Sequence, residues 1–168
     1  MPKTTMSRLG QVLAWSAALI LAGCESVPVT GATSSGGGNE LAVTGATPSD
    51  ADGTLVNLQV SSDPTASTTE GPATHVTITG TVDTVQQQVD VYILQADNSI
   101  PHAEHIWGSD LANPEGHTVC DVSSSVGPPC PPNEVVANGS GSLTFGGLQL
   151  GGAAGDGNTS TLNGRIEY

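Results

Sequence analysis

The chain has 168 residues and is strongly acidic, with 16 Asp and Glu against three Lys and Arg and a formal net charge of −13. A charge of this sign repels the phosphates of nucleic acids, which argues against nucleic acid as a partner. Gly, Ser, Thr and Val are abundant and helix formers are scarce, a composition that is typical of strands and turns.

The first 24 residues have the pattern of an export signal. Lys3 and Arg8 precede an apolar run at 12–22, which is about half the roughly 20 residues needed to span a bilayer. Small residues end the run at Gly23, directly before Cys24. A basic start, a short apolar stretch and small residues before the break predict that 1–23 is a signal peptide.

The tetrapeptide Leu21-Ala22-Gly23-Cys24 resembles the lipobox of bacterial lipoproteins. The resemblance implies that Cys24 becomes the first mature residue and carries fatty acids such as palmitate, which anchor the chain in the lipid bilayer. Several acyl chains on one residue make an anchor durable. Glu25 follows, whereas lipoproteins retained at the inner membrane usually carry Asp there. The implied localisation is the cell envelope, at the outer membrane if the source is Gram-negative.

Residues 24–53 are expected to form the lipidated cysteine and a flexible tether. They are rich in Gly, Ser, Thr and Ala and show no periodic apolar face, as linkers and disordered segments do. A single acidic domain is expected at 54–168, where the apolar residues begin to alternate.

Alternating apolar and polar residues in this domain predict short strands. The predicted strands are 55–60, 75–82, 89–96, 134–137, 142–150 and 160–168. Asn138-Gly139 predicts a hairpin turn, and Gly146-Gly147 a bulge in the strand that follows. With no helical period in the domain, the sequence predicts an all-β protein with a single antiparallel β-sandwich, immunoglobulin-like in the broad sense.

Cys120 and Cys130 are predicted to form a disulfide, because exported domains fold in an oxidising compartment. Their spacing is not the C-x-x-C of metal or redox pairs, which are the two alternatives. This cysteine loop and the segment VVANGSGSLT at 135–144 resemble part of the neocarzinostatin-type secreted sandwiches. The resemblance implies a sandwich fold; a second cysteine pair of that family is missing here.

A cluster of metal-ligating residue types falls in 97–134, which is predicted to be long and irregular. Imidazoles and carboxylates suit Zn²⁺ or Cu²⁺, and the candidate ligands are His102, Glu104, His105 and His117. Their spacing is not that of H-E-x-x-H, so solvated loop histidines are the alternative and no cofactor is expected. Calcium at Asp156, Asn158, Ser160 and Glu167 is a weaker alternative, because position 161 is Thr where an EF-hand loop needs Gly.

Trp107 is either an exposed contact for a partner or an apolar plug at the open end of the sandwich. The sequence has no G-x-S-x-G elbow and no phosphate loop, so we do not predict an enzyme. The predicted function is a membrane-anchored envelope lipoprotein displaying a non-catalytic interaction or structural module for an unidentified envelope partner. A metal-binding lipoprotein and an envelope hydrolase are the alternatives.

Overall fold

The computed structural model describes residues 38–47, 49–123, 127–152 and 157–168. They form eleven β-strands and one short 3-10 turn, η1 (Ser49–Ala51), and every pair of neighbouring strands is antiparallel. The predicted all-β, antiparallel fold is therefore confirmed. Within these ranges no helix has the length and apolar character required to cross a membrane.

The strands follow one another around the molecule in the order β2-β1-β11-β10-β8-β7-β6-β5-β3. Their bounds are β1 (Glu40–Thr44), β2 (Gly53–Thr54), β3 (Val56–Asp63), β4 (Ser67–Thr68), β5 (Gly71–Val82), β6 (Val85–Leu94), β7 (His102–Gly108), β8 (Gly116–Asp121), β9 (Val135–Asn138), β10 (Ser142–Gly152) and β11 (Thr159–Glu167). Two short strands lie off this path, because β4 pairs with β5 and β9 pairs with β10.

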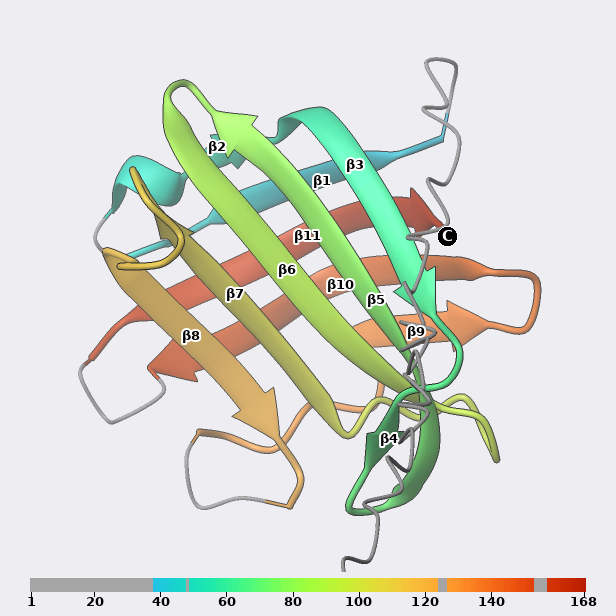
Figure 1. Cartoon of the computed structure of the whole chain (residues 1–168). Coiled ribbons are helices and arrows are strands. Elements are labelled where there is room, and N and C mark those ends of the chain that lie inside the picture. Colours follow the sequence, from blue (N-terminus) through green and yellow to red (C-terminus); the bar gives the residue numbers. More distant parts are fainter. Residues whose placement is uncertain (1–37, 48, 124–126, 153–156) are drawn as a thin grey trace, which may run out of the picture.

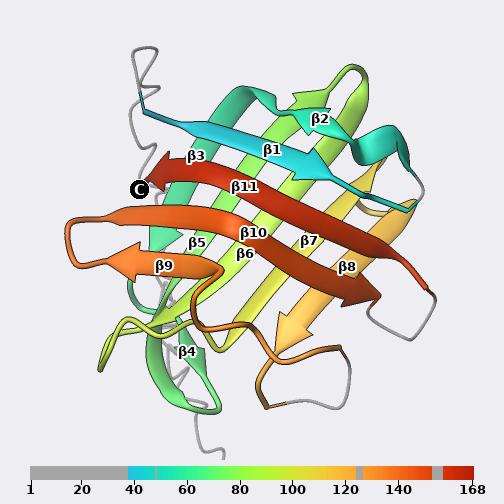
Figure 2. The same ribbon diagram turned by 180° about the vertical axis from the view of Figure 1, so that it is seen from behind.

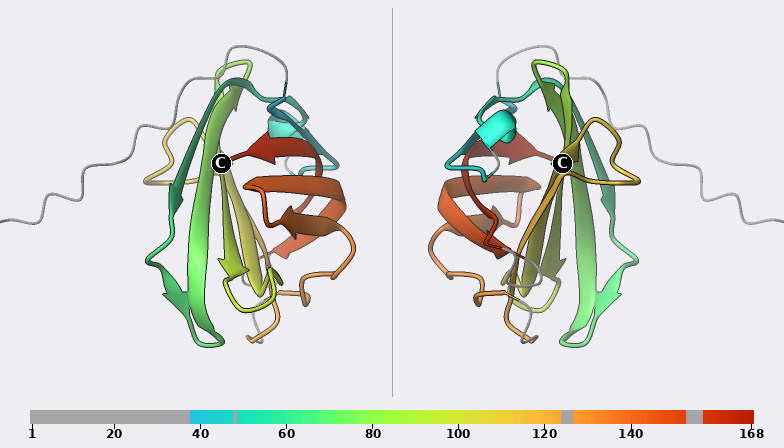
Figure 3. Two further views of the ribbon diagram at one scale, coloured as in Figure 1. Left: turned by 90° about the vertical axis from the view of Figure 1, so that its right-hand side faces the viewer. Right: turned by 90° about the vertical axis from the view of Figure 1, so that its left-hand side faces the viewer.

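Two layers of strands face each other across the core (Figures 1 and 3). One layer contains β3, β5, β6, β7 and β8. The strands β1, β9, β10 and β11 form the other layer, which is nearer the viewer in Figure 2 and crosses the first at a large angle. The layers join where the end of β10 pairs with β8, with Gly151 opposite Val119. At the opposite corner the chain passes from β2 to β3 through Leu55, whose N–H donates to the Leu41 carbonyl at 2.8 Å. The result is a nearly closed, barrel-like sandwich.

Alternate side chains of each strand fill the space between the layers. On β5 and β6 the inward side chains include Ile78 and Val91, which are fully buried, while Thr77 and Asp90 lie on the outer face. Trp107 is the largest of the fully buried side chains. Burial of these apolar groups is the main stabilising contribution to the fold.

The predicted domain boundary at residue 54 is wrong. β1 lies before that boundary and pairs with β11 along its whole length, and its Leu41 and Val43 side chains are fully buried. The apolar alternation of β1 is very short and is surrounded by Gly, Ser and Thr, so it does not stand out in the sequence. The remaining part of the predicted tether, 24–37, and the predicted signal peptide lie outside the described residues.

The predicted irregular segment, 97–134, contains two central strands. β7 and β8 form a hairpin that continues the sheet from β6. The inward side chains of β7 are Ala103, His105 and Trp107, and a histidine among them hides the apolar alternation. The predicted hairpin of β9 and β10 is confirmed, as is the bulge, where the register shifts between Gly146 and Leu148.

Candidate functional site

The four candidate metal ligands lie on two different faces of the sheet. His102, Glu104 and His117 are on the outer face of the β7–β8 hairpin, whereas His105 is fully buried in the core. Because successive strand residues point to opposite faces, His105 does not converge with the other three. Over the ranges that the structure describes, no group of three or more His, Cys, Asp or Glu is placed to hold a metal ion.

Each of the three outer histidines contacts a carboxylate. The pairs are His117 with Glu104 (Nε2 to Oε2, 2.9 Å), His102 with Asp121 (Nδ1 to Oδ2, 3.0 Å) and His75 with Asp90 (Nε2 to Oδ1, 2.7 Å). His75 and Asp90 are on neighbouring strands and meet because β5 and β6 pair in this register. Sequence reasoning misses this pair because neither residue belongs to a motif.

Asp90 is the most deeply placed of these carboxylates, with 4% of its side chain exposed. Besides His75, the Thr77 hydroxyl donates to it at 2.7 Å and the Gln88 amide at 2.6 Å. Burial raises the pKa of Asp90, but these hydrogen bonds outweigh burial and lower the pKa overall. The hydrogen bond to Asp90 likewise raises the pKa of His75 despite its partial burial. Both shifts favour the ionic form of the pair.

Tyr92 stands between two of these histidines. Its ring stacks on His75 with the centroids 4.3 Å apart, and it meets His102 edge-on at 5.5 Å. The two imidazoles come from the strands on either side, β5 and β7. Tyr92 therefore completes a row of three rings on the outer face of the sheet.

His105 is part of a buried polar chain in the core. Its Nε2 lies 2.7 Å from Gln87 Oε1, and its Nδ1 lies 3.2 Å from Ser160 Oγ. The Gln87 amide nitrogen donates to the Ala51 carbonyl at 3.0 Å, so Oε1 is the atom that accepts from the imidazole Nε2–H. Burial lowers the pKa of His105 to about 3, and the ring is therefore neutral, with the Ser160 hydroxyl donating to Nδ1.

The contact between His105 and Ser160 does not make a nucleophile. Both residues are buried, and the Ser160 hydroxyl also lies 2.7 Å from Thr118 Oγ1. A substrate does not reach this hydroxyl, so the contact gives the hydrolase alternative no support. The same burial removes Ser160 from the calcium alternative, whose first ligand, Asp156, lies outside the described residues.

The interpretation of Trp107 as a partner contact is wrong. Its side chain is fully buried, and its ring stacks on His105 with the centroids 4.7 Å apart. The indole N–H donates to Asp50 Oδ1 at 3.2 Å. Trp107 therefore packs inside the sandwich, as the plug alternative describes.

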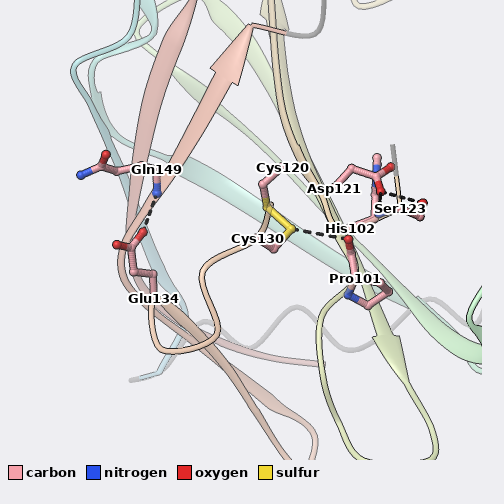
Figure 4. Close-up of a disulfide and its surroundings, with 8 residues drawn as sticks. All are labelled: Pro101, His102, Cys120, Asp121, Ser123, Cys130, Glu134 and Gln149. Carbon is pink, nitrogen blue, oxygen red and sulfur yellow. Dashed lines mark hydrogen bonds and ion pairs between the residues drawn. A yellow bond between two sulfur atoms is a disulfide. The ribbon is translucent and has the colours of Figure 1, made fainter. Parts of the chain in front are cut away.

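The predicted disulfide between Cys120 and Cys130 is confirmed (Figure 4). Cys120 is an inward residue of β8, and Cys130 lies within the proline-rich segment, 128–132, that leads to β9. The Asp121 N–H also donates to the Pro128 carbonyl at 2.9 Å, and Cys130 Sγ lies 3.7 Å from the Pro101 carbonyl oxygen. These contacts fix the proline-rich segment at the end of the sandwich.

A cavity of about 340 Å³ opens beside the disulfide, between the β6–β7 connection and β9. Its lining is mostly apolar and includes Leu94, Ile100, Pro101, Cys130, Val135 and Val136, with Glu70 as its charged residue. Ligand pockets are commonly of about 300–1,000 Å³ and mostly apolar. The sequence does not reveal this cavity, because its walls come from separate segments that only the sheet register and the disulfide bring together.

No protein-family model, curated protein or solved structure matches this chain. The resemblances to bacterial lipoproteins and to neocarzinostatin-type sandwiches therefore stay predictions from the sequence.

Proposed function

We propose that this chain is an exported lipoprotein, anchored through Cys24, that presents its β-domain as a non-catalytic binding module in the cell envelope. The observation that carries the proposal is the apolar cavity beside β9. The ends of β6 and β9 and the loops at 98–101 and 130–132 supply most of its lining, and the side chains of Val122 and Val136 on that lining are half-exposed. A concave apolar surface with few polar groups is the usual form of a ligand site.

The anchor is supported by the lipobox and by the position of β1. Residues 25–39 separate Cys24 from the start of β1 at Glu40. A segment of this length spans at most roughly 50 Å when fully extended. The proposed anchor would therefore keep the domain close to the membrane surface and restrict its partners to components of the envelope.

Fatty-acid labelling tests the anchor. We expect the full chain, expressed in a bacterial host fed an alkyne analogue of palmitate, to incorporate the label and to sediment with membranes. The matched Cys24→Ser chain is expected to remain unlabelled, because it lacks the thiol that is acylated. Equal labelling of the two chains, or labelling of neither, would reject the anchor.

Titration with the neutral dye Nile red tests the cavity. Val136→Lys puts an ammonium group at the cavity lining and is expected to weaken dye binding about fivefold, equivalent to ~1 kcal/mol. Val56→Lys is the matched control, because Val56 is 52% exposed on β3 and Val136 is 50% exposed on β9. An equal effect of the two substitutions would show that the dye binds outside the cavity.

A further inference from the structure

β9 is an edge strand whose free side runs along the cavity. Among the strands that the structure describes, it pairs with β10 alone (Figure 2). The Gly146 N–H donates to the Glu134 carbonyl at 2.7 Å. This bond identifies which residues of β9 form hydrogen-bonded pairs with β10. Because hydrogen-bonded and non-bonded pairs alternate in antiparallel strands, Val136 is bonded to β10. The N–H and C=O groups of Val135 and Ala137 therefore point away from β10.

The same three residues, Val135, Val136 and Ala137, line the cavity. A strand-addition site has two parts, which are unpaired backbone groups along a strand edge and an apolar cavity beside that edge. The backbone holds an extended segment by ladder hydrogen bonds, and the cavity receives one of its alternate side chains. Proteins usually protect such edges with charge, proline or a covering segment. On β9, the side chain that faces solvent is instead the half-exposed, apolar Val136.

Charge determines which kind of segment fits this edge. Glu70 lies on the cavity lining. Glu134 directly precedes β9, but its carboxylate lies on the β10 side of that strand, where it accepts from the Gln149 N–H at 3.1 Å (Figure 4). Arg165 is the only Lys or Arg after position 8 of the whole chain. An acidic segment, or a second copy of this chain, is repelled here, and a segment with Lys or Arg is attracted.

On these grounds, and resting on the proposed function, we propose that the occupant of the cavity is an extended basic peptide segment of a partner protein. The segment adds to β9 as a further antiparallel strand and pairs with the backbone of Val135 and Ala137. One of its apolar side chains enters the cavity, and its basic side chains face Glu70 on the cavity lining.

The probe is the synthetic peptide Lys-Thr-Val-Thr-Leu-Thr-Val-Lys, and its matched control has Glu in place of both Lys. The protein is the mature chain, 24–168, with Cys24→Ser, which retains every described element. We expect saturable binding of the basic peptide by fluorescence anisotropy, about tenfold tighter than the acidic one. Amide exchange measured by NMR is expected to slow at Val135 and Ala137, with no change on β3.

Two substitutions separate backbone pairing from charge. Ala137→Pro removes one free N–H while leaving the bonds to β10, since proline is tolerated at sheet edges, and is expected to weaken peptide binding at least about fivefold. Val136→Lys is expected to weaken binding about fivefold by repulsion, and Val56→Lys to leave it unchanged. If Ala137→Pro does not fold, a peptide N-methylated along one edge removes the same hydrogen bonds from the ligand side.

Four results would overturn the proposal. They are binding of neither peptide, equal binding of both, protection at an edge other than β9, and binding that Ala137→Pro or N-methylation leaves intact. Dimerisation that Ala137→Pro abolishes would assign the edge of β9 to a second copy of the chain. Peptide binding that appears only after deletion of residues 25–37 would assign the edge of β9 to residues 25–37. Dye binding without peptide binding would reject strand addition while leaving the proposed function in place.

Discussion

Gly116 shows at the scale of one residue how tightly the core is packed. A Cβ at this position would overlap the indole ring of Trp107, which is buried and held by His105 and Asp50. We therefore expect Gly116→Ala to lower the free energy of unfolding by about 1–3 kcal/mol, the usual cost of overpacking. Urea denaturation of the two chains measures this difference in the free energy of unfolding.

The control for this prediction is Gly139→Ala. Gly139 has open space where its Cβ would lie, so the same added methyl group meets no neighbour there. Equal stability of the Gly116→Ala chain and the wild type would contradict the packing of Trp107 described above.

Stability should also depend on pH through His105. Its pKa is about 3 in the folded chain and about 6.5 in an unfolded one. As the pH falls below 6.5 the unfolded chain gains a proton that the folded chain does not, so stability falls toward pH 3 by ~1.4 kcal/mol per pH unit. His75 makes stability depend on pH in the opposite direction, because its pKa is raised in the folded chain. Its stabilising contribution is present below pH 6.5 and is lost as the pH rises through the pKa of His75 in the folded chain.

NMR of the imidazole nitrogens separates the two histidines. We expect His105 to stay neutral, with its proton on Nε2, from pH 8 to pH 5. His75 is expected to titrate above its ordinary pKa. Titration of His105 near pH 6.5 would show that it is accessible to water and would contradict the buried chain with Gln87 and Ser160.

Single residues differ in how far the sequence predicts their roles. The pairing of Cys120 with Cys130 is predictable, because two thiols in a chain that the sequence predicts to be exported have one dominant chemistry. The role of His105 is not predictable, because a histidine on a strand is compatible with either face until the register of the neighbouring strands is known. The four predicted metal ligands do not converge for this reason: His102 and His105 are close in sequence and point to opposite faces of β7.

At the scale of elements, β1 and η1 are integral to the sandwich. β1 pairs with β11 along its whole length. η1 supplies two hydrogen-bond acceptors for buried side chains: the Ala51 carbonyl accepts from Gln87, and the Asp50 carboxylate accepts from Trp107. We expect a chain of residues 38–168 to fold cooperatively and a chain of 54–168 not to, because the latter leaves these buried donors unpaired. Circular dichroism during thermal denaturation measures both, and a cooperative transition for 54–168 would show that β1 is dispensable.

The disulfide stabilises the end of the sandwich. In the chain-entropy model, closing a loop of this size contributes about 3 kcal/mol. We expect the double variant Cys120→Ala/Cys130→Ala to lose a similar free energy of unfolding and to bind Nile red more weakly, because Cys130 and its neighbours line the cavity. A reductant should lower the melting temperature of the wild type and leave the variant unchanged.

The sequence predicts elements with a clear two-residue period, such as β5 and β6, and hairpins with a strong turn signal, such as β9 and β10. It does not predict β1, which is too short to show a period, or β7, which has polar residues on both faces. The cavity is a property of several elements together, so no local pattern indicates it.

At the scale of the whole molecule, the acidic charge opposes folding by self-repulsion. Salt screens this repulsion, since the Debye length falls from ~30 Å at 0.01 M to ~3 Å at 1 M. We expect the melting temperature of the 24–168 chain to rise steadily with NaCl over this range at pH 7. The rise should be smaller at pH 4, where many carboxylates take up protons, and an equal rise at both pH values would mean that salt acts by another route.

The central claim is that this sandwich is displayed on a membrane by its first mature residue. The most direct measurement is the intact mass of the full chain extracted from membranes of a bacterial host, with fragmentation of its N-terminal peptide. We predict a chain that begins at Cys24 and carries a mass addition of a diacylglyceryl group and further acyl groups on that residue. A chain that retains residues 1–23, or that begins at Cys24 without added lipid, would contradict the account.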